Sequence, residues 1–283
     1  MERIKKFRGL LASDFMKLAG MKSVYIGLGI MVFLTLIFGL AQNAFTALLQ
    51  EMPDSGAPVD PGAADALTGV FVNTMLNGAP SATGVFFLLP IIAALFVGSE
   101  FSSGMARLYI GRGVHKTELY TSKFIVLSML SVIYVCLAFA MCSIAAAASD
   151  IGEDTMRNIA AYTPSAFGSY VFLAVAMSAV YTAVCFALRS KAASMATLIA
   201  MLIVLGDILV IVVQIALGTS VTGEENAAGF VYMLFDPYYC ADAFAAARDF
   251  TAREAGIAYG GCAMWLVLFF TGGLVLNAKR DVK

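Results

Sequence analysis

Few side chains in this chain are capable of acid–base or metal chemistry. Only one histidine, His115, occurs among the 283 residues, which excludes HExxH zinc chemistry and multi-histidine metal sites. The sequence contains neither a GxSxG nucleophile elbow nor a GxxxxGK[ST] phosphate loop, and no nucleophile has an evident base beside it. We therefore expect a protein that is not an enzyme and holds no cofactor or metal. Any energy it uses must come from an ion gradient or from another chain.

The five cysteines do not form a pattern with known chemistry. They include no CxxC pair, so neither a disulfide framework nor a metal site is indicated. Four of them lie in apolar runs, which favours a role as small packing residues. The five are Cys136, Cys142, Cys185, Cys240 and Cys262.

One carboxylate stands out because it lies deep in an apolar run. Asp207 follows Gly206 near the middle of residues 193–217. A carboxylate in lipid costs at least about 3 kcal/mol, so it must face protein, a cavity or a partner. Two interpretations stay open: Asp207 lines a translocation pathway or couples an ion, or its carboxyl group fixes the packing of helices.

The composition shows what kind of element must position these residues. Hydrophobic residues make up 60% of the chain and charged residues 13%, whereas about a quarter of a soluble domain is charged. No polar stretch is long enough to fold as a separate domain. The sequence therefore predicts an all-α polytopic membrane protein, with residues 1–283 forming a single transmembrane domain in the lipid bilayer.

Apolar runs of membrane length predict six transmembrane helices. A basic segment precedes them at 1–22, with apolar residues at helical spacing, and is expected to form an amphipathic helix at the interface. We expect Pro90 to kink the second span, and Thr163 with Pro164 to cap the fourth. The six spans are 23–42, 85–98, 123–147, 165–188, 193–217 and 257–276.

The charges between the spans predict their sidedness. Fifteen of the 18 lysines and arginines lie in segments assigned to the inside, namely 1–22, 99–123, 189–191 and 279–283. The long loops 43–84 and 218–256 are predominantly acidic and are assigned to the outside. Because basic loops stay in the cytoplasm, both termini are predicted to be cytoplasmic.

The polar segment 99–123 carries a more specific pattern. It resembles the segment that follows the second span of ABC-2-type transporter permeases, in which E-[FY]-x-x-G-T-x-[KR] is followed by G-x-x-[RK] and then by an aromatic residue, a small residue and often Lys. Met105 stands where that family commonly has Thr, and Lys116 where it has Arg. Six spans, an amphipathic N-terminal helix and a basic tail also match. The residues that carry the pattern are Glu100, Phe101, Gly104, Arg107, Gly113, Lys116, Tyr120, Ser122 and Lys123.

The resemblance implies the permease subunit of an ATP-driven ABC exporter in the bacterial plasma membrane. Such a subunit pairs with a second permease, identical or paralogous, and with a separate ABC ATPase, and it has no nucleic acid partner. Asp207 is then expected on the translocation pathway. The substrate is not indicated. The segment that docks on the ATPase would contain Glu100, Phe101, Gly104, Arg107, Arg112, Gly113 and Lys116.

Two other functions remain open on the sequence alone. The chain could be a self-sufficient channel or an ion-coupled transporter that uses Asp207, or it could be a membrane scaffold or immunity-type subunit. The basic segment 99–123 could equally serve to anchor a turn to lipid head groups.

Overall fold

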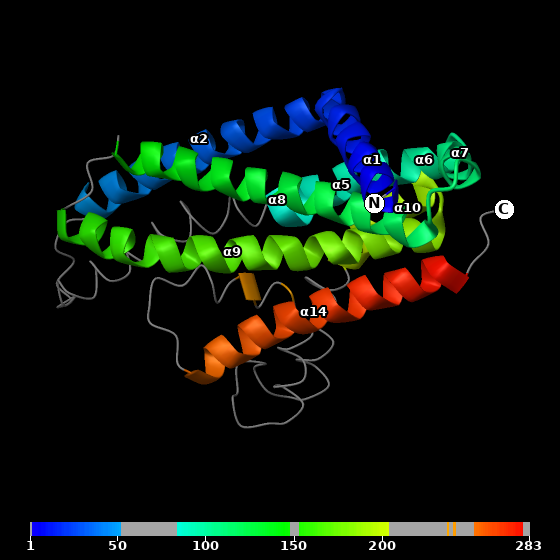
Figure 1. The fold of residues 1–283 in the computed structure, drawn as a ribbon. Coiled ribbons are helices and arrows are strands. Elements are labelled where there is room, and N and C mark those ends of the chain that lie inside the picture. Colours follow the sequence, from blue (N-terminus) through cyan, green and yellow to red (C-terminus); the bar gives the residue numbers. More distant parts are fainter. Residues whose placement is uncertain are drawn as a thin grey trace.

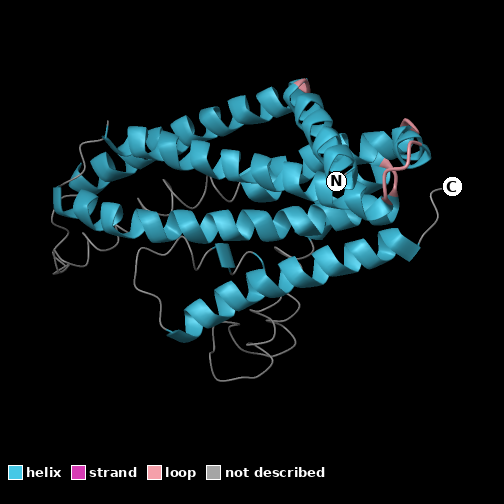
Figure 2. Ribbon diagram, viewed as in Figure 1, coloured by secondary structure: helices cyan, strands magenta, loops and turns pink. Residues whose placement is uncertain are grey.

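A computed structural model describes residues 2–51, 84–147, 153–203, 237, 240–241 and 252–279. Within these ranges every regular element is a helix and no strand occurs (Figure 2). The expected all-α class is therefore confirmed for the part of the chain that is described. Asp207 lies outside these residues, as do most of loops 43–84 and 218–256 and the end of the basic tail.

The N-terminal region forms two helices that meet at a sharp bend. Helix α1 spans Glu2–Ala19 and α2 spans Lys22–Glu51, with an angle of 58° between them. The break lies at Gly20, a residue type that only proline exceeds in disfavouring a continuing helix. On α1 the side chains of Leu10, Asp14 and Leu18 are buried. The predicted amphipathic helix is thus confirmed, whereas its position at a membrane interface stays a prediction.

The second apolar segment is a continuous but irregular helix over Gly84–Ser102. It consists of the π-helical turn η2 (Gly84–Leu88), α5 (Leu89–Ala93), the π-helical turn η3 (Ala94–Gly98) and α6 (Ser99–Ser102). Pro90 is at the start of α5 and has no N–H for the helical ladder. The π-helical turns η2 and η3 lie on either side of α5. Irregularities in helices are commonly found at such π turns and at prolines.

The remaining long helices are α8 (Lys116–Ala147), α9 (Glu153–Leu188), α10 (Lys191–Ile203) and α14 (Ala252–Lys279). Three helices extend beyond the spans expected from the apolar runs. The α2 helix continues past residue 42, α8 begins before 123, and α9 begins well before 165. At α8, the Glu118 carboxylate accepts a hydrogen bond of 3.2 Å from the His115 N–H, which caps the helix at this earlier start.

Thr163 and Pro164 were expected to cap the start of the fourth span. This prediction was wrong, because Pro164 lies inside α9. A proline removes one backbone hydrogen bond, which packed transmembrane helices tolerate. The residues before it include good helix formers, among them Arg157, Ala160 and Ala161, and the helix continues through the proline.

The described helices have the lengths and composition of a membrane protein. Four are long and apolar enough to cross a membrane, namely Gly84–Ser102, Lys116–Met141, Thr163–Leu188 and Ala255–Lys279, and the bent pair α1–α2 would make a fifth. Large apolar side chains on their outer faces are exposed, among them Phe33, Ile133 and Val267. Such faces suit contact with lipid. The span expected at 193–217, of which residues 193–203 are described, and the common side of the two termini stay predictions.

Helix α8 lies at the centre of the bundle, beside α2 on one side and near α9 and α14 on the other (Figure 1). Two buried tyrosines of α8 fix this arrangement. The Tyr134 hydroxyl donates to the Val24 carbonyl of α2, and the Tyr120 hydroxyl donates to the Phe269 carbonyl of α14, both at 3.2 Å. The Tyr120 ring lies so close to Gly273 that a Cβ there would be 2.3 Å from its hydroxyl oxygen. Close packing therefore sets the position of α8.

Candidate coupling site

Residues 99–123 form a hairpin at one end of the bundle, near α1 and the end of α14 (Figure 1). The chain leaves through α6, turns at Gly104, runs through α7 (Met105–Gly111), turns again at Gly113 and enters α8. Gly104 has φ +74° and Gly113 has φ +84°, values that glycine adopts without steric cost. Glycines therefore form both turns, and we call this unit the 99–123 hairpin.

The outer face of α7 combines arginines with large apolar side chains. Arg107 and Arg112 are exposed, while Met105 and Leu108 are 40% and 55% exposed. Ala106 is buried and faces the rest of the protein. A short helix with exposed apolar and guanidinium groups is a surface suited to protein contact, since arginine and methionine are enriched in interface cores.

The base of the hairpin is held by a buried ion pair between its two limbs. Glu100 of α6 is only 2% exposed, and Lys123 of α8 is fully buried. The Lys123 Nζ lies 2.6 Å from the Glu100 Oε1. A second ammonium, on Lys17 of α1, lies at the same distance from that oxygen. Glu100 therefore faces inward and joins three helices.

Asp14 completes this group from α1. Its Oδ1 lies 2.5 Å from the Lys123 Nζ, and its Oδ2 accepts a hydrogen bond of 2.6 Å from the Ser122 hydroxyl. We call Asp14, Lys17, Glu100, Ser122 and Lys123 the charge cluster. Lys123 occupies its centre, because its ammonium contacts both carboxylates.

The electrostatics of the charge cluster explain how it can be buried. Two carboxylates and two ammonium groups make the formal charge zero, and each carboxylate accepts at least two short contacts. The Phe96 ring adds a cation–π surface, with its centroid 4.6 Å from the Lys123 Nζ and 5.4 Å from the Lys17 Nζ. Paired in this way, buried charges are tolerated, but removing one partner leaves another uncompensated.

The charge cluster determines which helices must move together. Because Lys123 binds both Glu100 and Asp14, the two limbs of the hairpin and α1 are held at one point. A displacement of α7 must therefore move the start of α8, the end of the second apolar helix and α1 together, or break buried ion pairs. Within the described residues no group of three or more His, Cys, Asp or Glu side chains could hold a metal ion.

The site residues predicted from the sequence divide into two groups. Glu100 is buried and Phe101 is half-buried, with its ring 5.1 Å from that of Phe186 on α9. The second group is exposed on the hairpin and consists of Arg107, Arg112 and Gly113.

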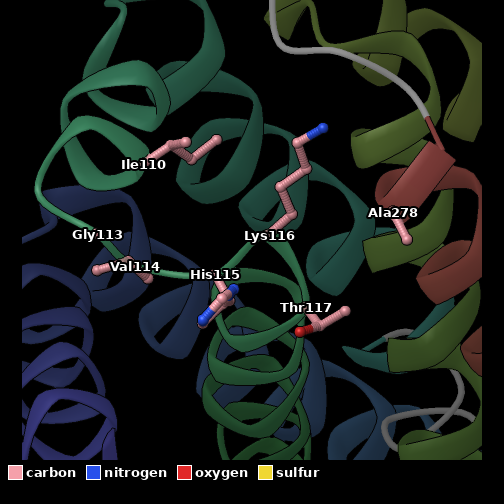
Figure 3. Close-up of a pocket in the computed structure, with 7 residues that line it drawn as sticks. All are labelled: Ile110, Gly113, Val114, His115, Lys116, Thr117 and Ala278. Atoms are coloured by element: carbon pink, nitrogen blue, oxygen red, sulfur yellow. The ribbon is translucent and has the colours of Figure 1, made fainter.

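Lys116 is half-buried at the start of α8, where its carbonyl accepts a hydrogen bond of 2.7 Å from the Asn277 side chain. This bond ties the end of α14 to the hairpin. A pocket between these parts is shown in Figure 3; it is lined by Ile110, Gly113, Val114, His115, Lys116, Thr117 and Ala278. The single histidine thus lies on the exposed side of the hairpin and outside the charge cluster.

The sequence analysis missed the contribution of α1 to this site. Asp14 and Lys17 were not singled out, although one signal was available. Asp14 stands four residues after Leu10 and four before Leu18, so a carboxylate falls in the apolar row of the helix. An acid in such a row needs a buried cation, and Lys123 provides it.

The comparisons with known proteins add no family assignment. Neither the protein-family models nor the curated proteins contain a match to this chain. Functional inference therefore depends on the motif in the 99–123 hairpin and on the geometry described above.

Proposed function

We propose that this chain is the permease subunit of an ATP-driven exporter of the ABC-2 type. It would form the translocation pathway together with a second permease, identical or paralogous, in a bacterial plasma membrane. A separate ATPase subunit would bind and hydrolyse ATP. The proposal includes six spans with both termini in the cytoplasm.

The observation that carries this proposal is the buried ion pair of Glu100 and Lys123 at the base of an exposed hairpin. We call this ion pair the clamp. Glu100 and Lys123 both belong to the motif shared with the permeases, and they lie 2.6 Å apart although 23 residues separate them. A hairpin that served only to connect two spans would need no buried ion pair. A hairpin that must transmit force to the spans benefits from a rigid base.

The outer face of α7 would be the surface that meets the ATPase. Its exposed Arg107 and Arg112 suit an acidic cleft, and Met105 and Leu108 supply apolar area. Charge complementarity would orient the two proteins, while the apolar residues would contribute most of the affinity.

Force from the ATPase would pass to the spans through buried contacts. Within the hairpin, Glu100 and Lys123 carry the movement to the second apolar helix and to α8. Phe101 contacts Phe186 of α9 edge-on. Gly98 lies so close to the start of α10 that a Cβ there would be 2.9 Å from the Lys191 Cα. One displacement would therefore reach several spans at once.

The docking role can be tested by reversing the exposed charges. The Arg107→Glu/Arg112→Glu double variant and the wild type are purified from the native membrane in mild detergent. The wild type is expected to retain an ATPase with a phosphate loop, and the double variant to lose most of it. Lys22→Glu is a matched control, since Lys22 is exposed and lies outside the hairpin.

Two outcomes would contradict the proposal. A wild-type protein that carries no ATPase, under conditions that preserve membrane complexes, would exclude the exporter assignment. An ATPase retained equally by the double variant and by Lys22→Glu would exclude α7 as its docking surface.

A second experiment separates docking from transmission. Glu100→Gln removes a charge from the clamp and leaves the outer face of α7 unchanged. We expect this variant to keep its ATPase and its membrane insertion but to hydrolyse ATP with little export. Full export by Glu100→Gln would show that the clamp does not transmit force.

A further inference from the structure

Two cysteines from different segments, Cys240 and Cys262, lie near each other where residue 240 packs against α14. Cys240 belongs to a short segment that lies between α9 and α14 (Figure 1), and Cys262 is on α14. Both are fully or almost fully buried, with exposed fractions of 0% and 1%. The structure has both as free thiols.

Separate hydrogen bonds hold Cys240 and its neighbour Ala241 in place. The Cys240 Sγ donates to the Ala258 carbonyl at 3.4 Å. Ala258 stands one helical turn before Cys262, so the two residues share a face of α14. On the opposite side, the Tyr170 hydroxyl of α9 donates to the Ala241 carbonyl at 2.9 Å. The Cys240 backbone is therefore held where its sulfur lies against the turn of α14 that leads to Cys262.

We propose that Cys240 and Cys262 form a disulfide bond in the mature protein. Both S–H bonds break and one S–S bond of about 2 Å forms. The two electrons and the two protons pass to the disulfide of an extracytoplasmic thiol–disulfide oxidoreductase, which becomes a dithiol. The bond would join the segment at residue 240 covalently to α14.

The compartment follows from the sidedness proposed above. Residue 240 belongs to the segment assigned to the outside, where disulfides form and persist in many cells. Because both sulfurs are buried in the folded protein, the reaction belongs to the period before Cys240 packs against α14. The same burial would afterwards shield the bond from reductants.

The other described cysteines provide an internal comparison. Cys136 is exposed, whereas Cys185 is as deeply buried as Cys240. Burial alone therefore does not distinguish the proposed pair; the contact of the Cys240 Sγ with the turn of α14 that leads to Cys262 does.

The experiment measures the redox state of the full-length protein in its own membrane. Free thiols are blocked with N-ethylmaleimide in denaturant at the moment of lysis, and the digest is analysed by mass spectrometry with and without reduction. We expect a linked peptide pair that contains Cys240 and Cys262, lighter by two hydrogen atoms than the separate peptides. Of the five cysteines, these two should resist the reagent until they are reduced.

Two variants check that the link is specific. Cys240→Ser should make Cys262 reactive without reduction, whereas Cys185→Ser should leave the linked pair intact. Alkylation of both Cys240 and Cys262 in the unreduced wild type would overturn the proposal. So would a link from either residue to a different cysteine. None of these outcomes depends on whether an ATPase binds the chain.

Discussion

Replacing Lys123 by methionine tests the energetic role of the charge cluster. The methionine side chain has similar length but no charge, so it removes the ammonium and keeps most of the packing. Lys123 is fully buried and lies 2.5 Å from Asp14 and 2.6 Å from Glu100. Its loss leaves the buried Asp14 carboxylate without an ammonium partner. Breaking a buried pair in this way costs about 3–5 kcal/mol.

Lys17→Met is the matched control within the same cluster. Its side chain is 35% exposed, and Glu100 keeps its contact with Lys123 when Lys17 is removed. A partly exposed ion pair contributes about 0–1 kcal/mol. Asp14→Asn combined with Lys123→Met removes one charge of each sign, so this double variant should be more stable than the sum of the single changes predicts. The coupling should fall at about 1–3 kcal/mol.

The assay is thermal unfolding of the purified protein in one detergent, followed by the fraction that stays monodisperse after heating. For a chain of this size, 1 kcal/mol corresponds to about 2 °C in Tm. Lys123→Met should therefore lower Tm by roughly 6–10 °C, and Lys17→Met by at most about 2 °C. A Lys123→Met protein that melts within about 1 °C of the wild type would refute the argument from buried charge. So would a larger loss for Lys17→Met.

Two further predictions concern close packing against glycines. Gly98→Ala should lower stability by about 1–3 kcal/mol, because its Cβ would lie 2.9 Å from the Cα of the first residue of α10. Gly111→Ala has nothing within 4 Å of the added carbon and should melt like the wild type; equal melting of the two variants would contradict this packing. Gly273→Ala places a carbon 2.3 Å from the Tyr120 hydroxyl oxygen and should also lower Tm by several degrees. Its neighbour Gly272→Ala meets nothing within 4 Å, so a similar Tm for both would show that α8 and α14 are not in the described contact.

The parts of the fold that depend on local pattern could be predicted from the sequence. The helix near the N-terminus was expected from the spacing of its apolar residues, and α1 covers Glu2–Ala19. The long apolar runs predicted helices, and every regular element among the described residues is a helix. In both cases the determining residues are close together in the chain.

Helix ends were predicted less well because hydropathy and helix formation do not stop at the same residue. Lys116 and Glu118 lie in the polar segment before the apolar run, yet both favour helix, and Glu118 caps α8. Likewise Pro164 is typical of a helix start but lies inside α9. A membrane span can be shorter than the helix that contains it, so charge boundaries indicate the span and not the helix.

The candidate site could be predicted only in part because its contacts are long-range. The motif indicated Glu100 and Lys123 as members of one segment but did not indicate that they form an ion pair. Asp14 and Lys123 are separated by 109 residues, and no local spacing relates them. The proximity of Cys240 to the turn of α14 that leads to Cys262 was missed for the same reason, since only the packing of residue 240 against α14 brings them together.

The most direct test of the proposed function is the mass of the intact complex, measured by native mass spectrometry after gentle extraction from the chain's own membrane. The account predicts an assembly with two permease subunits, of which this chain contributes at least one copy of 30.0 kDa, together with two copies of an ATPase. Adding ATP should leave that composition unchanged while the ATPase hydrolyses it. A chain found without any ATPase, and active after reconstitution with only an ion gradient, would contradict the account.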